Sequence, residues 1–126
     1  MAPNSEAVIR TIAMPADTNP AGDIFGGWLL SQVDLAAGNA AARRARGRCA
    51  TVSIEKVSFL IPVRVGDEVS VYATLLSVGR TSMRFQVEAW RRARDGENNI
   101  KVTDAVFTFV ALDNDGRPRA LPLLIT

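Results

Sequence analysis

Two adjacent glycines and one aspartate are the residues of this chain whose types and spacing could do chemistry. Gly26 and Gly27 follow a turn-rich segment and open a predicted helix, where the first backbone N–H groups have no partner within the helix. Without side chains these amides are open to a ligand, and the helix dipole favours negative charge there. Asp34 is the one acid of the same helix. The three residues therefore combine donors for a negatively charged oxygen with a carboxylate that could act as base or nucleophile.

The helix that must position these groups is predicted from about Phe25 to Ala45, and its geometry predicts that Asp34 faces the interior. The polar residues at helical spacing, which should face solvent, are Gln32, Asn39, Arg43 and Arg46. Asp34 lies about 200° around the axis from Gln32, at roughly 100° per residue. Burying a carboxylate is costly unless it is hydrogen-bonded. Asp34 is thus either chemically active or a structural group that caps a loop or pairs with an arginine.

Length and composition predict one globular domain over residues 1–126. The chain is 48% hydrophobic and 22% charged, which excludes a disordered protein. Its apolar runs are far too short for a membrane span, and the segment Met1–Glu6 does not resemble a secretory signal. A single cysteine excludes an internal disulfide, so we expect a cytoplasmic protein. The net charge of +2, without a long basic run, argues against nucleic acid as a partner.

The absence of histidine narrows the chemistry further. It excludes Ser-His-Asp and Cys-His catalysis within the chain, and it leaves one cysteine as the only soft metal ligand. We therefore expect no metal and no separate cofactor. Any hydrolysis would depend on carboxylates, backbone amides and water.

The remaining pattern predicts an α+β layer. A first strand covers Glu6 to Met14, and a loop containing Asn19 leads to Asp23, a candidate N-cap of the helix. Four antiparallel strands are predicted after the helix, with a bulge at Glu55–Lys56 where the apolar alternation changes parity. One long helix against a curled antiparallel sheet is the expected arrangement.

The glycine and aspartate segments closely resemble the YciA-type acyl-CoA thioesterases, which have the hotdog fold. The resemblance is carried by Gly22-Asp23-Ile24-Phe25-Gly26-Gly27-Trp28 and Ser31-Gln32-Val33-Asp34, and it continues through Thr51-Val52-Ser53, Val65-Gly66-Asp67 and Val102-Thr103-Asp104-Ala105. It implies that Asp34 is the catalytic carboxylate and that Asp23 assists from a partner subunit. It also implies an acyl-CoA site at a homodimer interface, with trimers of dimers as a common assembly.

Thioester hydrolysis builds negative charge on the carbonyl oxygen, which the amides near Gly26 and Gly27 could stabilise while Asp34 acts as general base or forms a mixed anhydride. Coenzyme A enters only as part of the substrate. We expect its phosphates at the turn Gly79-Arg80-Thr81-Ser82 with Arg48 or Arg84, although a solvated hairpin would look the same. The further candidate substrate contacts are Asn19, Phe25, Trp28, Leu30 and Phe59.

Three rival functions remain. A non-catalytic acyl-CoA-binding module would not need Asp34. A hydratase or dehydratase of the same fold would depend on histidine, which this chain lacks. A purely structural oligomer would not need Gly26 and Gly27 at the start of its helix.

Overall fold

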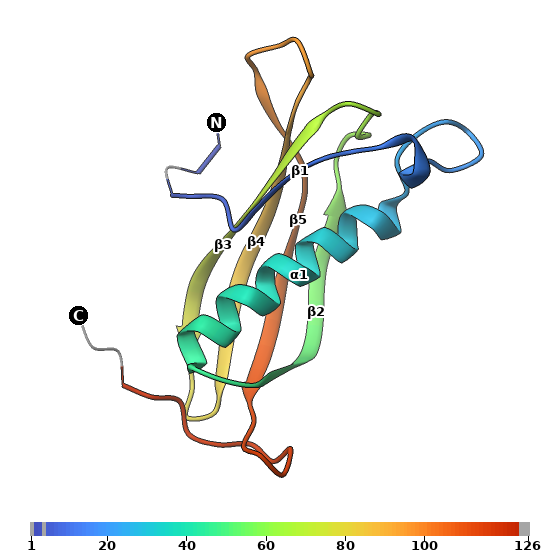
Figure 1. Ribbon diagram of the computed structural model, residues 1–126. Coiled ribbons are helices and arrows are strands. Elements are labelled where there is room, and N and C mark those ends of the chain that lie inside the picture. The colour runs from blue at the N-terminus through green and yellow to red at the C-terminus, as the bar shows by residue number, and fades with distance from the viewer. Residues whose placement is uncertain (1, 4, 124–126) are drawn as a thin grey trace.

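The computed structural model describes residues 2–3 and 5–123 of the chain, and it contains one long helix lying across a curved antiparallel sheet (Figure 1). The elements in chain order are β1 (Ile9–Ile12), the short 3-10 helix η1 (Pro15–Asp17), α1 (Gly26–Ala45), β2 (Cys49–Phe59), β3 (Glu68–Val78), β4 (Ser82–Arg92) and β5 (Asn99–Ala111). The predicted order of one strand, a long helix and four antiparallel strands is confirmed. Within the described residues, no helix is both long and apolar enough to cross a membrane.

The sheet has the strand order β1-β3-β4-β5-β2, so the strand that follows the helix ends up at an edge. β3, β4 and β5 form an antiparallel meander. β2 pairs antiparallel with the free side of β5, with Cys49 opposite Ala111 at one end and Phe59 opposite Thr103 at the other. The pairing of β2 with β5 shifts between Glu55 and Ser58, where Lys56 has a φ of +55°. The predicted bulge is therefore confirmed.

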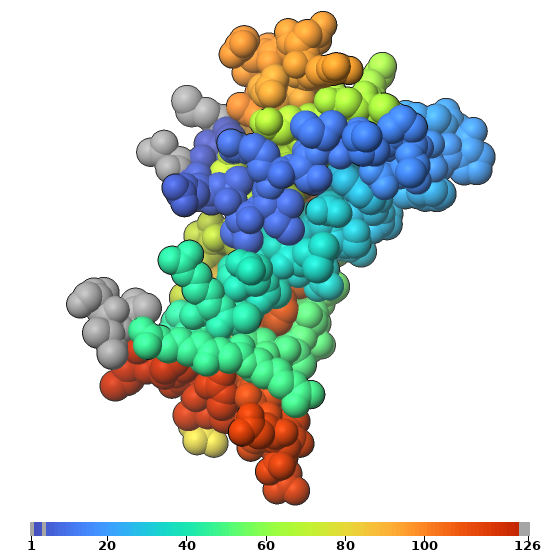
Figure 2. Space-filling view, in the orientation of Figure 1, coloured from blue at the N-terminus to red at the C-terminus, as the bar shows by residue number. Residues whose placement is uncertain are grey.

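Helix α1 packs on the sheet through a stripe of mostly small side chains. Its buried residues are Leu29, Val33, Ala36, Ala37, Ala41 and Ala45. Small residues let the helix axis approach the sheet closely, and the inward-facing Met83, Phe85 and Phe107 fill the space beneath it. The outer side of α1 is left uncovered along its length (Figure 2).

The helix begins differently from the prediction. Phe25 is the N-cap, without a side-chain cap, and Asp23 is exposed rather than a capping residue. The reason lies in the preceding turn, where the Asn19 side chain accepts hydrogen bonds from the N–H groups of Ala21 and Asp23 at 3.0 and 3.1 Å. These bonds hold the backbone of Asp23 two residues before the N-cap Phe25, so its carboxylate is out of register with the free amides.

The turn before β3 depends on one buried carboxylate. Asp67 accepts a hydrogen bond from the Arg64 N–H at 2.9 Å, and its Oδ2 lies 3.3 Å from Nη1 of Arg91. Both partners are largely withdrawn from solvent, with side-chain exposures of 6% for Asp67 and 19% for Arg91. Removing one member of such a pair leaves a charge without its partner.

We therefore expect Asp67→Ala to lower the free energy of unfolding by about 3 kcal/mol. Urea denaturation followed by circular dichroism measures the change. In a double-mutant cycle, Arg91→Met should cost much less in the Asp67→Ala background than in the wild type. A cost below about 1 kcal/mol for Asp67→Ala, the range of exposed ion pairs, would contradict this assignment.

Candidate active site

The start of α1 presents free backbone donors. Within the described residues, the N–H groups of Gly26 and Gly27 have no hydrogen-bond acceptor, whereas Leu29 N–H donates to the Phe25 carbonyl at 3.2 Å. A methyl group added at Gly26 would lie 3.6 Å from the Phe59 ring, and one added at Gly27 would meet open space. The amide of Gly27 is thus the more accessible of the two.

An apolar cleft of about 280 Å³ adjoins these amides. It lies between the start of α1 and the segment that follows β2. Its lining residues are Ile24, Gly26, Leu29, Phe59, Leu60, Ile61, Pro62 and Val63. Phe59 and Leu60 are half exposed, which is unusual for large apolar side chains in an otherwise well-packed fold. This cleft, called the glycine cleft below, can hold an apolar group next to hydrogen-bond donors.

Asp34 does not face the interior of its own chain, and that prediction is wrong. Its side chain is exposed, and within the described residues no hydrogen bond or ion pair engages the carboxylate. The buried stripe runs through Val33 and Ala37, so Asp34 falls at its border, beside the outward-pointing Leu35. Helical periodicity gives the direction of a side chain, but the side chain is buried only where another element covers it. Here β2 does not cover Asp34.

Asp34 nevertheless lines a second cleft, of about 380 Å³, between α1 and the first half of β2. The lining residues of this aspartate cleft are Asp34, Leu35, Gly38, Asn39, Ala42, Cys49, Thr51 and Phe109. Burial raises the pKa of the Cys49 thiol, and the Arg119 guanidinium opposes this only in part. The thiol therefore stays protonated at neutral pH and is a poor nucleophile, which leaves Asp34 as the candidate reactive group of this cleft.

The two clefts of one chain are too far apart to act on the same atom. Asp34 follows Gly27 by seven residues, which corresponds to roughly 10 Å along a helix that rises 1.5 Å per residue. A base and an oxyanion donor must both lie within about 3 Å of a reacting group. A complete site would therefore need the glycine cleft of one chain and the aspartate cleft of another.

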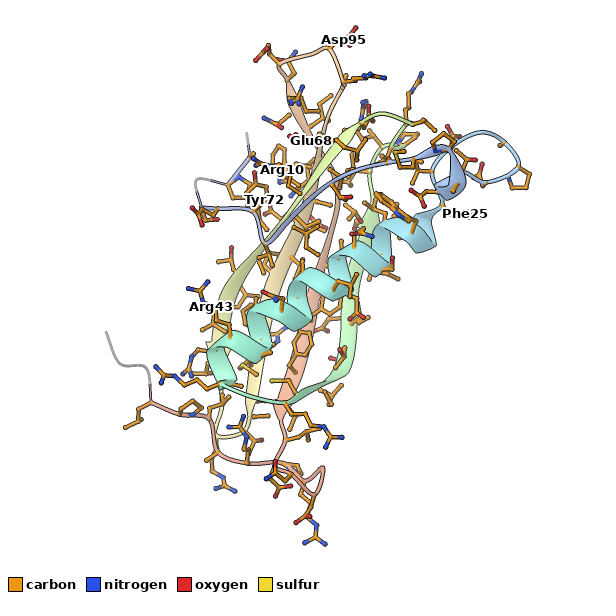
Figure 3. The ribbon with its side chains drawn as sticks, in the orientation of Figure 1. Arg10, Phe25, Arg43, Glu68, Tyr72 and Asp95 are labelled. Carbon is orange, nitrogen blue, oxygen red and sulfur yellow. The ribbon has the colours of Figure 1, made fainter. Side chains whose placement is uncertain are left out.

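The other candidate contacts are spread over both ends of the molecule. Phe25 marks the start of α1, where Asn19 and Asp23 lie, and Arg43 marks the last turns (Figure 3). Trp28 is half-buried and packs against the core rather than lining either cleft. Arg84 is engaged with Glu55, with Nη2 and Oε1 2.8 Å apart.

The turn Gly79-Arg80-Thr81-Ser82 closes the sheet at the C-terminal end of α1. The Gly79 N–H donates to the Ser82 carbonyl at 2.8 Å, and Thr81 accepts from the N–H of Ala111. Arg48 lies at the same end, since its carbonyl accepts from Leu112 in the segment that follows β5. Arg48 and Arg80 are thus at the same end of the molecule, whereas Arg84 is held on the sheet by Glu55.

Comparison with known proteins decides the family. A model of the thioesterase superfamily matches residues 21–96, which include α1 and β2. The chain belongs to the thioesterase superfamily. The acyl-CoA thioester hydrolase YciA of Escherichia coli is 47% identical over 124 residues, covering 96% of this chain and 94% of YciA.

Solved structures agree with this assignment. The hexameric thioesterase from Yersinia pestis has a TM-score of 0.91 and 48% identity, covering 97% of this chain and 99% of that one. The hexameric hotdog fold thioesterase of Campylobacter jejuni has a TM-score of 0.87 and 40% identity, covering 94% and 91%. The YciA-type resemblance and the hotdog fold expected from the sequence are confirmed.

The two clefts also contain residues that the sequence pattern did not single out. Gly38, Cys49, Thr51 and Phe109 line the aspartate cleft, and Ile61 and Val63 line the glycine cleft. Gly38 is the one that sequence reasoning could have found, because a glycine in the middle of a helix is unfavourable. The structure adds that a methyl group there would meet open space. The others are ordinary strand residues whose position depends on the pairing of β2 with β5.

Proposed function

We propose that this chain hydrolyses acyl-CoA thioesters to the free acid and coenzyme A, within a site shared by two copies. The observation that carries the proposal is the separation between two half-sites on α1. Free amides stand beside an apolar cleft at the helix start, and an unpaired carboxylate stands in a cleft about two turns further on. Membership of the thioesterase superfamily supports the same reaction, and YciA is named as an acyl-CoA thioester hydrolase.

The edge strand β2 favours a second copy of this chain as the partner. No other strand of the described residues pairs with its outer edge. With its flanks it forms an apolar strip, defined by Leu35, Val52, Ile54, Val57, Phe59 and Leu60, all between 37% and 59% exposed. An uncovered apolar edge strand is a template for pairing. Two copies that pair antiparallel along β2, with a two-fold axis near Ile54, would place Phe59 of one copy opposite Cys49 of the other.

That pairing brings unlike half-sites together. Phe59 touches the glycine cleft, and Cys49 lines the aspartate cleft of the same chain. A two-fold axis between them therefore places the amides of Gly26 and Gly27 from one copy beside Asp34 of the other, twice per dimer. The named relatives from Yersinia pestis and Campylobacter jejuni are hexameric, which is compatible with three such dimers.

In the proposed reaction, the thioester carbonyl oxygen accepts hydrogen bonds from the glycine amides of one copy. Asp34 of the other copy takes a proton from water as the water oxygen attacks the carbonyl carbon. The carbon–sulfur bond then breaks, and the leaving CoA thiolate takes the proton from Asp34, which returns the carboxylate to its starting state. Alternatively, the Asp34 carboxylate attacks first and water hydrolyses the resulting anhydride. Both routes use the same residues and no cofactor beyond the substrate's own coenzyme A. We place the CoA phosphates near Arg48 and the turn from Gly79 to Ser82.

Side chains added at Gly27 should separate catalysis from stability. Gly27→Ala should raise the free energy of unfolding by about 0.4–1 kcal/mol, because alanine restricts the unfolded chain. Gly27→Val should lower kcat by roughly 10²–10³, since its methyl groups keep the carbonyl from the amide, as if one oxyanion donor were lost. Denaturation and a thiol-release assay measure the two effects. Equal activity of the valine variant and the wild type would remove the amide from the mechanism.

The direct test of the function is a panel of acyl-CoA thioesters of graded chain length, with free thiol release as the readout. Turnover of several chain lengths, absent with buffer alone, is the expected result. Binding without turnover across the whole panel would instead identify a non-catalytic acyl-CoA-binding module.

A further inference from the structure

A cavity of about 680 Å³ lies beside the C-terminal half of α1, and Asn39 borders both this cavity and the aspartate cleft. It is formed by the end of α1, the segment before β1, the middle of β3 and the last described residues of the chain. Its lining residues are Glu6, Ala7, Val8, Asn39, Ala40, Arg43, Arg44, Arg46, Ala73 and Leu123. This volume is within the range of roughly 300–1,000 Å³ that is typical of small-ligand sites.

Three arginines and one glutamate supply the charge of this arginine cavity. Within the described residues, Arg43, Arg44 and Arg46 form no ion pair, whereas Arg10, Arg84, Arg91 and Arg92 all do. Figure 3 labels Arg43 on the last turns of α1. The cavity therefore carries a net positive charge, which Glu6 offsets only in part, and guanidinium groups bind phosphate with matched geometry.

Arg44 provides the most specific observation. Its Nη1 donates to the Pro122 carbonyl at 2.9 Å, which holds the last described residues against the cavity. Its Nε is buried and has no hydrogen-bond acceptor within the described residues. Buried donors are nearly always satisfied, so an unsatisfied one in a cavity wall is a place for a ligand oxygen.

A structural explanation covers only part of this arrangement. Cations near a helix C-terminus complement the helix dipole, which accounts for basic residues in the last turn of α1. It does not account for a cavity or for the buried, unsatisfied Nε of Arg44. Arg46 also adopts a left-handed conformation, with φ of +55°, which a glycine would adopt at less cost.

We propose that the arginine cavity binds the phosphate groups of a small phosphorylated ligand such as a nucleotide. The arginines contact the phosphates, and the alanines with Val8 and Leu123 contact the uncharged part. The ligand is either free in solution or the phosphate end of a substrate held by another copy. The second source rests on the proposed function and would place the CoA phosphates in this cavity instead of near Arg48 and the turn from Gly79 to Ser82. Apart from Asn39, which also borders the aspartate cleft, the cavity shares no lining residue with the two clefts of the proposed reaction, and phosphate binding does not depend on that reaction.

Isothermal titration with ADP, pyrophosphate and adenosine tests the site. ADP and pyrophosphate should bind and adenosine should not, with affinity falling as salt rises. Arg43→Gln and Arg46→Gln should each weaken ADP binding roughly ten-fold or more, as expected for a lost charged hydrogen bond. Arg94→Gln, in the exposed β4–β5 loop, is the matched control and should bind as the wild type does.

Two kinetic arms distinguish the source of the phosphates. If the substrate supplies them, the Arg43 and Arg46 variants raise KM for acyl-CoA but not for an acyl-N-acetylcysteamine thioester, which has no phosphate. If a free ligand supplies them, KM is unchanged for both substrates while ADP binding is lost. If both variants bind ADP with the affinity of the wild type, the proposal is overturned. It is also overturned if the native protein binds neither ADP nor pyrophosphate. Both outcomes are independent of whether the chain hydrolyses thioesters.

Discussion

Asp34→Asn should lower kcat for acyl-CoA hydrolysis by roughly 10²–10⁴ and leave the fold unchanged. The expectation follows from the role of a positioned general base, whose loss typically costs that much. Asparagine has nearly the same shape but cannot accept the proton of water or attack a carbonyl as a carboxylate does. Because Asp34 makes no hydrogen bond or ion pair with the described residues, its replacement removes no structural contact within the chain.

Thiol release under saturating substrate measures the effect, with KM and the thermal midpoint recorded alongside. Asp95→Asn is a suitable control, since Asp95 is an exposed aspartate in the β4–β5 loop, far from both clefts (Figure 3). The variant should keep KM within a few-fold of the wild type, since the side chain acts on the reaction rather than on binding. Undiminished hydrolysis by Asp34→Asn would remove this carboxylate from the mechanism.

A charge on the apolar strip of β2 should abolish both assembly and activity. Val52 is 56% exposed, and with a two-fold axis near Ile54 it lies opposite Lys56 of the second copy. Val52→Lys therefore places like charges together in an apolar interface, twice per dimer. Such contacts cost several kcal/mol, so association should weaken by roughly a hundredfold or more.

Sedimentation at micromolar concentration should show a shift from oligomer to monomer, and hydrolysis should fall in proportion to the monomer fraction. Val65→Lys changes an equally apolar, 45% exposed residue in the turn before β3 and should leave both properties intact. The decisive observation is whether assembly and hydrolysis are lost together in Val52→Lys. A monomeric Val52→Lys protein with full activity would mean that one chain holds a complete site.

Sequence reasoning was most successful where local physics decides the outcome. The glycines, the alanine-rich stripe and the change of parity at Glu55–Lys56 predicted the helix and the bulge, because periodicity and backbone freedom act over a few residues. The family was predicted for a similar reason, since its motifs are contiguous. The N-cap was missed because Asn19, rather than the helix, determines the conformation at Asp23 through hydrogen bonds to Ala21 and Asp23.

The amino-acid sequence by itself therefore determined the hotdog fold, the thioesterase family and the identity of the reactive carboxylate candidate. Only the tertiary structure decided that Asp34 lies at the border of the buried stripe, that β2 is an edge strand of the described sheet, and that three arginines line a cavity beside the end of α1. The physical reason is that periodicity specifies the direction of a side chain, whereas burial and pairing depend on which distant segments cover it.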